Sequence, residues 1–420
     1  MSTRRAAVCL WTLTGAVLAL LLVKFFVADV YRVDSGSMRP TLFGGRERPD
    51  GEDDSERVLV RYDQAPPARF DLVVIRSPDG EKPLVKRVCG LPGDQDLMIR
   101  DGDLFVDRKR LPADAPRPAP VPVYDDRYQE PERFFELPRA GAARREGNAW
   151  VVEGDAHAPG SLLLFHPELR DDYLDRHGKL VPGVVEVNDA RLELEFALEQ
   201  PRAGELLRFE LTEEGDLFEV VLEPHASDGT TVRLVRDRSE PEASGHAERE
   251  LRRTELPLAL EAGRWYDLEF SNIDNHLRVR SRALGLDLAQ DYDENEPLHE
   301  PSEGRTGPSR PQNLGPRVRF GVQDGRARFR GVRVLRDLFY TEDGRFGVRH
   351  RPDASRAIDG PYPSGDAVSL GPDDYFLLGD NSAASTDSRH FGPRKASDLL
   401  GRPLFVVWPD PHWLRATEDP

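Results

Sequence analysis

A serine pair near the start of the sequence has the residue types of a nucleophile site. Ser35, Gly36 and Ser37 form a Ser-Gly-Ser triplet. A glycine between two serines permits a tight, exposed turn, in which one hydroxyl can face a cleft while neighbouring backbone amides converge. Most Ser-Gly-Ser triplets are simply loops, so the triplet alone assigns no function.

Lysine is scarce in this sequence, and one of the few lysines continues an aliphatic run. Only 6 of the 58 Lys and Arg side chains are lysine, and Lys86 directly follows Leu84 and Val85. Burial lowers the pKa of a lysine amine, whereas arginine stays charged, so only lysine could act there as a general base. The competing interpretation is an edge-strand lysine that extends its amine into solvent, which residues 84–86 alone favour.

A third stretch, residues 379–389, concentrates small hydroxyl side chains, two acids and an arginine in one short loop. Its members include Asp380, Ser385, Asp387 and Arg389. Together such groups can build a hydrogen-bonded support around a catalytic amine. The alternative is a polar turn with an Asp–Arg pair at the surface, which contributes little to stability.

Short strands are expected to position these three stretches. The runs are β-branched or aliphatic and are separated by Gly, Pro and Asp, as is typical of buried strands: Val58–Val60, Leu72–Ile75, Leu84–Val85, Tyr375–Leu378 and Leu404–Trp408. A Pro-rich stretch, Leu111–Val123, follows the first three of these runs and predicts an exposed connector.

The middle of the chain has a different pattern. From about residue 184 to 336, apolar and polar residues alternate in many short runs, as in Leu192, Leu194 and Phe196. This period of two predicts an antiparallel β-sandwich. Residues 262–280 also resemble strands of the concanavalin-like and laminin-G-like jelly rolls. An acidic run containing Asp291, Asp293 and Glu296 could ligate calcium, although a solvated loop is the favoured interpretation.

The N-terminal residues predict a membrane anchor. Residues 6–23 carry no charge, and a helix of that length spans roughly 27 Å, close to the thickness of a bilayer core. Arg4 and Arg5 precede the run, so the positive-inside rule places the N-terminus in the cytoplasm and the rest outside it. A cleaved secretory signal is the alternative, which the length of the run and Phe26 disfavour.

Composition excludes several classes of function. The 420 residues carry a net charge of −17, so no basic surplus exists for binding nucleic acid. Cys9 and Cys89 are the only cysteines, which excludes a disulfide framework and multi-cysteine zinc sites. The histidines have no metal-ligand spacing, and we assign no metal or cofactor.

Taken together, the three stretches and the apolar N-terminus resemble the type I signal peptidases, which are membrane-anchored serine–lysine endopeptidases. The resemblance covers residues 1 to about 110 and about 365 to 409. It implies that Ser37 is the nucleophile and Lys86 the general base, and that the Ser37 backbone N–H and the Ser35 hydroxyl form the oxyanion hole. Supporting roles are implied for Ser385, which would bind the lysine, and for an ion-pair cluster of Asp380, Asp387 and Arg389.

Two positions depart from the pattern of that family. Asp34 stands where proline is usual, and Cys89 stands where small or aliphatic residues are usual. Neither change removes a catalytic group. The charge of Asp34 is expected to raise the pKa of Lys86 slightly.

The expected fold is mainly β, with an N-terminal transmembrane helix, a signal-peptidase-type β core and an inserted, jelly-roll-like antiparallel sandwich. The expected divisions are residues 1–29 for the cytoplasmic stub and anchor, 30–150 and 341–420 for the peptidase core, and 151–340 for the insert. The insert is expected to fold independently.

The expected function is removal of signal peptides from exported preproteins at the outer side of the cell (inner) membrane. The implied partners are secretory preproteins with A-x-A cleavage patterns, the lipid bilayer and a nearby secretion translocon. One alternative is a membrane-anchored sandwich that binds glycan or protein beside an inactive peptidase core, which the intact set of Ser37, Lys86 and Ser385 disfavours. A self-cleaving repressor of the related serine–lysine type would need a DNA-binding helix-turn-helix in place of the apolar run.

Overall fold

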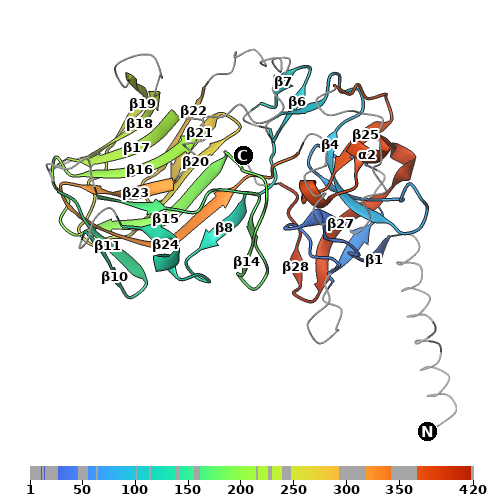
Figure 1. Ribbon diagram of the computed structural model, residues 1–420, viewed down its shortest axis with the longest axis horizontal. Coiled ribbons are helices and arrows are strands. Elements are labelled where there is room, and N and C mark those ends of the chain that lie inside the picture. The colour runs from blue at the N-terminus through green and yellow to red at the C-terminus, as the bar shows by residue number, and fades with distance from the viewer. Residues whose placement is uncertain are drawn as a thin grey trace, which may run out of the picture. The chain divides into compact units, whose positions relative to one another are not determined.

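The chain folds mainly as β-structure in two compact units (Figure 1). The computed structural model describes residues 11, 14, 27–45, 55–62, 65–100, 102–112, 115–137, 142–155, 161–213, 216–225, 229–238, 247–292, 318–341 and 367–417. The first unit comprises Met1–Ala119 and Phe339–Pro420, and the second is Pro120–Leu338. The second unit is therefore an insertion into the first.

The expected transmembrane helix, residues 6–23, lies outside the described residues except for Trp11 and Thr14. In the ranges that the structure describes, no helix combines the length and apolar character needed to cross a bilayer.

An eight-stranded antiparallel sheet organises the first unit. Its order is β1-β2-β27-β3-β4-β25-β26, with β28 added beside β27. The strands are β1 (Ala28–Arg32), β2 (Arg57–Arg61), β3 (Leu72–Ile75), β4 (Leu84–Gly90), β25 (Asp374–Leu378), β26 (Arg394–Lys395), β27 (Leu399–Trp408) and β28 (His412–Trp413). A separate three-stranded sheet contains β5 (Met98–Arg100), β6 (Asp103–Val106) and β7 (Lys109–Arg110).

The apolar run of β3 is buried on both of its faces. Leu72 and Val74 join one cluster of buried side chains, whereas Val73 and Ile75 join another. Successive side chains of a strand point to opposite faces, so a strand with a core on each face is apolar at every position. The aliphatic runs predicted at β2, β3, β4, β25 and β27 are thus confirmed as strands.

The inserted unit is an antiparallel sandwich of two sheets, as the alternation predicts. One sheet has the order β10-β11-β24-β15-β20-β21-β22, with β8 beside β24, and the other has the order β19-β18-β17-β16-β23-β12-β9. The strands are β8 (Val121–Asp125), β9 (Phe135–Glu136), β10 (Ala143–Glu146), β11 (Ala149–Glu153), β12 (Ser161–Phe165), β15 (Ala190–Leu198), β16 (Leu206–Glu213), β17 (Asp216–Pro224), β18 (Thr230–Arg238), β19 (Ala247–Leu256), β20 (Tyr266–Ile273), β21 (His276–Ser281), β22 (Leu286–Asp291), β23 (Val318–Gln323) and β24 (Arg326–Arg336). A small hairpin pairs β13 (Tyr173–Leu174) with β14 (Leu180–Val181).

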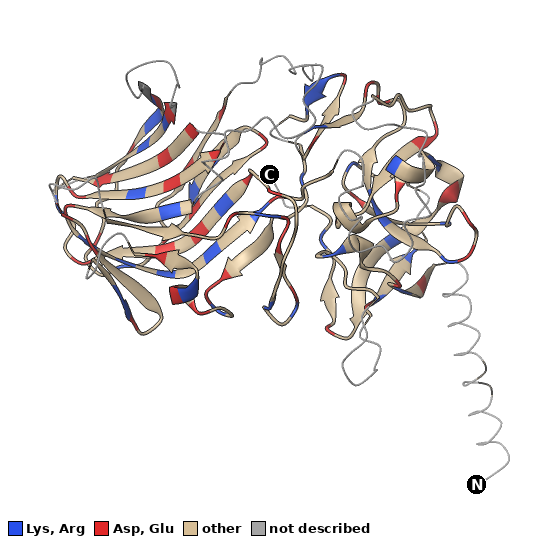
Figure 2. Cartoon of the chain, in the orientation of Figure 1, with Lys and Arg blue, Asp and Glu red and all other residues tan. Residues whose placement is uncertain are grey.

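The core of the insert lies between its two sheets. Phe196 of β15 and Phe329 of β24, from one sheet, have ring contacts with Phe209 of β16, from the other. The polar residues that alternate with these aromatics carry charges of both signs, interleaved along the strands in Figure 2. Cross-strand pairs such as Glu195–Arg330 join them. Each such pair contributes little energy at a half-exposed site, but the period of two fixes which face is buried.

The boundaries of the insert differ from the expected 151–340. The first junction falls at Ala119/Pro120 because β8 and β11 both pair with β24 of the insert. The Pro-rich connector therefore runs directly into β8. The second junction falls at Leu338/Phe339.

Residues 120–338 expressed alone should show a cooperative thermal transition and a β-type circular dichroism spectrum. The reason is that the main core cluster of the insert draws all its residues from Val123 to Val334, and a unit with its own core can fold by itself. A matched fragment of residues 151–338 lacks β8 and most of the edge formed by β10 and β11, and should lose cooperativity. A non-cooperative transition of the longer fragment would contradict the prediction.

Candidate active site

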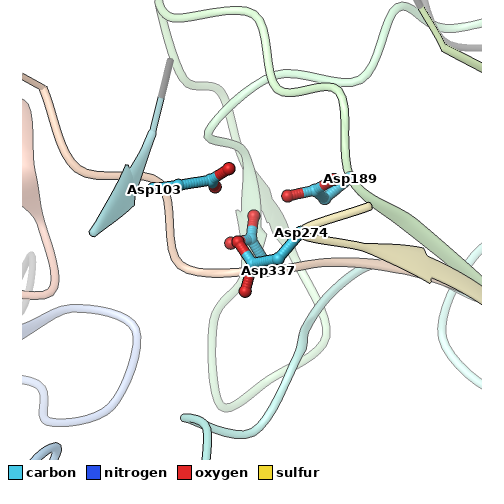
Figure 3. Close-up of side chains that lie close together, drawn as sticks. All are labelled: Asp103, Asp189, Asp274 and Asp337. Atoms are coloured by element: carbon cyan, nitrogen blue, oxygen red, sulfur yellow. The ribbon is translucent and has the colours of Figure 1, made fainter. Parts of the chain in front are cut away.

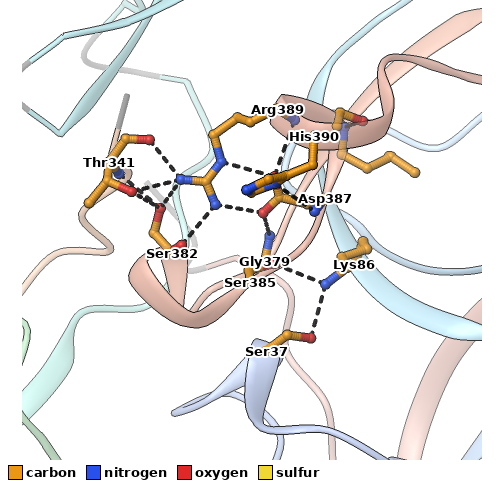
Figure 4. Close-up of polar contacts among 11 residues, drawn as sticks. Ser37, Lys86, Thr341, Gly379, Ser382, Ser385, Asp387, Arg389 and His390 are labelled. Carbon is orange, nitrogen blue, oxygen red and sulfur yellow. Dashed lines mark hydrogen bonds and ion pairs between the residues drawn. The ribbon is translucent and has the colours of Figure 1, made fainter. Parts of the chain in front are cut away.

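The structure brings together the predicted nucleophile, the predicted base and the predicted supporting serine (Figure 4). Ser37 lies in a 3-10 turn, η1 (Gly36–Met38), Lys86 lies in β4, and Ser385 directly follows the turn η4 (Ser382–Ala384). Lys86 Nζ lies 2.9 Å from Ser37 Oγ and 3.0 Å from Ser385 Oγ. Lys86 is 2 % exposed, so the interpretation of a solvent-reaching edge lysine is wrong.

The position of β4 explains the burial of Lys86. This strand lies between β3 and β25, and its residues from Val85 to Gly90 are all buried. Burial lowers the pKa of Lys86 to about 8, and the charge of Arg389 acts in the same direction, whereas Asp387 and Asp380 oppose them. A substantial fraction of the amine is therefore neutral near pH 8, as a general base requires.

The loop after β25 holds the serine turn η1 in place. Asn381 donates from its backbone N–H to Ser37 O at 3.0 Å and from Nδ2 to Gly36 O at 3.1 Å. A Cβ on Gly379 would lie 2.2 Å from Ser385 Oγ and 2.5 Å from Ser37 O. Only glycine allows the two segments to approach this closely.

The Ser35 hydroxyl faces the nucleophile. Ser35 Oγ lies 3.1 Å from Ser37 Oγ. Ser37 itself lies in the first turn of a short helix, where backbone N–H groups lack partners within the helix. The Ser37 backbone N–H and the Ser35 hydroxyl are the two groups that the family resemblance implies as donors to an oxyanion.

The acidic and basic support consists of two separate buried ion pairs. Arg389 donates from Nε and Nη2 to the two carboxylate oxygens of Asp387, at 2.9 and 2.7 Å. Arg87 donates from Nε and Nη2 to the two oxygens of Asp380, at 2.7 and 2.6 Å. The expected cluster of Asp380, Asp387 and Arg389 thus omitted Arg87, the partner of Asp380.

Asp387 stays ionised although it is buried. Burial would raise its pKa, but the charge of Arg389, hydrogen bonds with His390 and Arg389 and the charge of Lys86 together hold the pKa well below its usual range. Asp387 also caps the short helix α2 (Ser388–Phe391). The carboxylate therefore fixes both the loop and the arginine.

Arg87 is the functional neighbour that the sequence analysis missed. Its guanidinium also donates to Phe70 O at 2.9 Å and to Ala416 O at 2.5 Å. The signal was present, because an arginine next to a buried strand lysine needs a buried acceptor of its own. Its partner lies 293 residues further along the chain, where no local pattern could identify it.

The two departures from the family pattern, Asp34 and Cys89, differ in their surroundings. Asp34 pairs with Arg32 and Lys82, at 3.3 and 3.2 Å. The charges that act most strongly on the pKa of Lys86 are those of Asp387, Arg389 and Asp380. Burial raises the pKa of the Cys89 thiol to about 12, which keeps it protonated.

A second group of carboxylates lies in the insert, where Asp189, Asp274 and Asp337 point toward one another (Figure 3). Their ligand atoms lie within 4.8 Å of one another. The fourth residue drawn, Asp103, belongs to the first unit. An acidic cluster alone does not define a metal site, and we assign none. Of the residues considered for calcium, Asp291 pairs with His276, while 293 and 296 lie outside the described residues.

Residues 6–156 and 342–408 match the family described as "Signal peptidase, peptidase S26". The chain belongs to this signal peptidase family. The match covers the serine turn, β4 and the loop after β25, and it leaves out most of the insert.

Relatives of this chain are similar to it over part of their own length. "Signal peptidase I" of Streptococcus pneumoniae serotype 4 is 42 % identical over 101 residues, which cover 24 % of this chain and 43 % of that protein. "Signal peptidase I V" of Bacillus subtilis is 36 % identical over 103 residues, which cover 24 % and 56 %. The chain thus spans about half the length of the curated relatives it matches.

A solved structure of the CBM2 module of the evolved Dit protein of Lactobacillus casei BL23 phage J-1 also resembles part of the chain. It has a TM-score of 0.35 and 10 % sequence identity, and the match covers 54 % of this chain and all of that one.

Arg87→Met should lower the free energy of unfolding of the first unit by about 3 to 5 kcal/mol, because it leaves the Asp380 carboxylate buried without its arginine. The double variant Arg87→Met/Asp380→Leu should regain part of this loss, since neither charge remains. Urea unfolding followed by fluorescence measures both. Arg108→Met is the control: its pair with Asp96 is largely exposed, so its loss should cost at most about 1 kcal/mol. Equal stability of Arg87→Met and the unmodified protein would contradict the prediction.

Proposed function

We propose that this signal peptidase is a membrane-anchored serine endopeptidase that removes N-terminal signal peptides from exported preproteins through a Ser37/Lys86 dyad. The observation that carries the proposal is the buried Lys86 amine, 2.9 Å from the Ser37 hydroxyl, with a pKa lowered to about 8. The names of the relatives, and the family itself, support signal peptides as the substrate class.

In the proposed reaction, neutral Lys86 accepts the proton of Ser37 Oγ while that oxygen attacks the scissile carbonyl. The hydrogen bond from Lys86 to Ser385 orients the amine. The proton passes to the leaving amine, and an acyl group remains on Ser37. Lys86 then deprotonates a water that hydrolyses the ester. No metal or cofactor is needed for these steps.

The negative oxygen of the tetrahedral intermediate needs fixed donors. The Ser37 backbone N–H and the Ser35 hydroxyl are proposed to supply them. Small binding subsites upstream of the scissile bond would select the A-x-A pattern.

We also propose that residues 6–23 anchor the chain in the cell (inner) membrane, with the N-terminus in the cytoplasm. The support is the uncharged run after Arg4 and Arg5. Catalysis would then take place at the outer surface of the bilayer, close to the translocon from which preproteins emerge.

A binding protein with an inactive core is the second candidate. The complete hydrogen-bonded set of Ser37, Lys86 and Ser385 weighs against it, because a buried amine with a lowered pKa beside a serine hydroxyl is typical of catalytic sites.

Ser37→Ala, Lys86→Ala and Lys86→Arg should each reduce preprotein cleavage by several orders of magnitude, because the two groups act as one unit and a guanidinium does not deprotonate. The assay uses the detergent-solubilised full chain, a preprotein and N-terminal sequencing of the product. Lys395→Ala, which removes an exposed lysine paired with Asp374, should retain cleavage. Substantial cleavage by a folded Ser37→Ala or Lys86→Ala variant would refute the dyad.

The value of kcat/KM should rise with pH through about pH 8 and level off roughly one pH unit higher. Only the neutral form of Lys86 can accept the proton, and its fraction grows as the pH passes the lowered pKa of about 8. Initial rates at substrate concentrations well below KM, measured between pH 6 and 10, give kcat/KM and hence the pKa of the free enzyme. A rate that falls over the range from pH 6 to 8 would contradict the role of Lys86.

Ser35→Ala should lower kcat by about 100- to 1,000-fold with little change in KM, because the lost donor acts on the transition state. Ser35→Thr keeps the hydroxyl and should be milder. Steady-state kinetics separate the two constants. A loss found wholly in KM would make Ser35 a substrate-binding contact instead.

A further inference from the structure

The segment that follows the insert enters the hydrogen-bond network of the active site. Phe339–Thr341 are the first residues of the second part of the first unit. Tyr340 donates from its backbone N–H to Gly102 O at 3.1 Å, which attaches the segment to the turn before β6. Thr341 is 4 % exposed and belongs to none of the motifs that the sequence analysis identified.

Thr341 binds the outer side of the Arg389 guanidinium (Figure 4). Arg389 Nη1 donates to both the carbonyl oxygen and Oγ1 of Thr341, each at 2.7 Å. Ser382 Oγ accepts from the same nitrogen at 2.7 Å and from the Thr341 backbone N–H at 2.8 Å. The guanidinium is thus held on one side by Thr341 and Ser382, and on the other by Asp387.

From Arg389 the network continues to the base. Asp387 Oδ2 accepts from the Gly379 backbone N–H at 3.0 Å. Gly379 in turn lies against Ser385 Oγ and Ser37 O. Ser385 accepts a hydrogen bond from Lys86. Thr341 is therefore connected to the amine through an unbroken set of buried contacts, without touching it.

We propose that Thr341 is a positioning residue, which holds Arg389 in its two-point pair with Asp387 and thereby sets the balance of charge around the Lys86 amine. The proposal rests on the role of Lys86 proposed above. It makes the segment that follows the insert a structural part of the active site.

The sign of the effect follows from the two opposed charges. Arg389 lowers the pKa of Lys86 and Asp387 raises it. If the guanidinium moves away from its place, the Asp387 charge acts on the amine with less compensation, and the pKa of Lys86 rises. Less neutral amine is then available below that pKa, while the rate at high pH is retained.

Three variants of Thr341 in the full chain separate positioning from packing. Thr341→Val replaces Oγ1 by a methyl group, which cannot approach a nitrogen at 2.7 Å and needs about 3.5 Å or more. It therefore removes the acceptor and displaces the guanidinium. Thr341→Ala removes the acceptor only, and Thr341→Ser retains it. Thr230→Val is the matched control, because it removes a buried hydroxyl that donates to Leu258 O in the insert.

The measurement is the titration of Lys86 by NMR of the full chain carrying ¹³Cε-labelled lysine. The sequence has only six lysines, and Lys86→Ala assigns the signal. In Thr341→Val the midpoint should move up by about 0.5 to 1 unit, with a smaller rise in Thr341→Ala, and kcat/KM near pH 6 to 7 should fall about three- to tenfold. Thr341→Ser and Thr230→Val should leave the midpoint unchanged.

An unchanged midpoint in folded Thr341→Val would overturn the proposal. If Thr341→Val does not fold, an unchanged midpoint in Thr341→Ala would overturn it in the same way. The titration does not depend on turnover, so it also separates this proposal from the proposed function. If the midpoint shifts in Thr341→Val but the unmodified chain cleaves no preprotein, the positioning role is supported and the proposed function is refuted.

Discussion

The candidate active site depends on one constraint: a primary amine must be buried beside a serine hydroxyl and must stay partly neutral. Lys86 gives both of its described hydrogen bonds to hydroxyl oxygens, those of Ser37 and Ser385. A carboxylate in direct contact would restore the positive charge and remove the base. The two nearby acids are instead each bound by an arginine, Asp380 by Arg87 and Asp387 by Arg389.

This charge pairing explains why the loop after β25 is so rich in hydrogen bonds. Each buried carboxylate must be fully solvated by protein groups, because an unpaired charge in the interior is costly. Asp380 accepts from Thr41 as well as from Arg87, and Asp387 accepts from the backbone of Gly379. Asn381, which holds the serine turn, belongs to the same loop as both acids, so this one loop fixes the charges and the position of the turn.

The insertion is compatible with this site because it brings its own core. Its cluster of buried side chains is separate from the two clusters of the first unit. Ser37 and Lys86, the proposed nucleophile and base, precede the insert, whereas Ser385 and both acids follow it. Pairing of β4 with β25, which joins Val88 to Leu377 and Arg87 to Leu378, reassembles the site across 299 residues between Lys86 and Ser385.

The sequence was informative wherever chemistry or burial is local. The serine turn, the strand that carries Lys86, the loop after β25 and the alternation of the insert could all be read from neighbouring residues. The burial of Lys86 is an exception, since residues 84–86 alone favour an exposed lysine. The pairing of Arg87 with Asp380 could not be read either, because two acids of one loop offer equivalent partners until the fold is known. The first boundary of the insert also escaped prediction, since β8 and β10 are short and contain Pro122 and Arg144, so they carry too little apolar pattern to be assigned to either unit.

Ser35, at the start of the serine turn, does not make the hydrogen bond that is usual for an N-cap serine. Ser35 is the N-cap residue of η1, where a serine side chain ordinarily accepts a hydrogen bond from the backbone of the turn. Ser35 makes no such cap, and its hydroxyl lies 3.1 Å from Ser37 Oγ. The turn is held by Asn381 from outside instead. Because another segment stabilises the turn, the Ser35 hydroxyl is not needed for capping and remains available for the oxyanion role proposed for it.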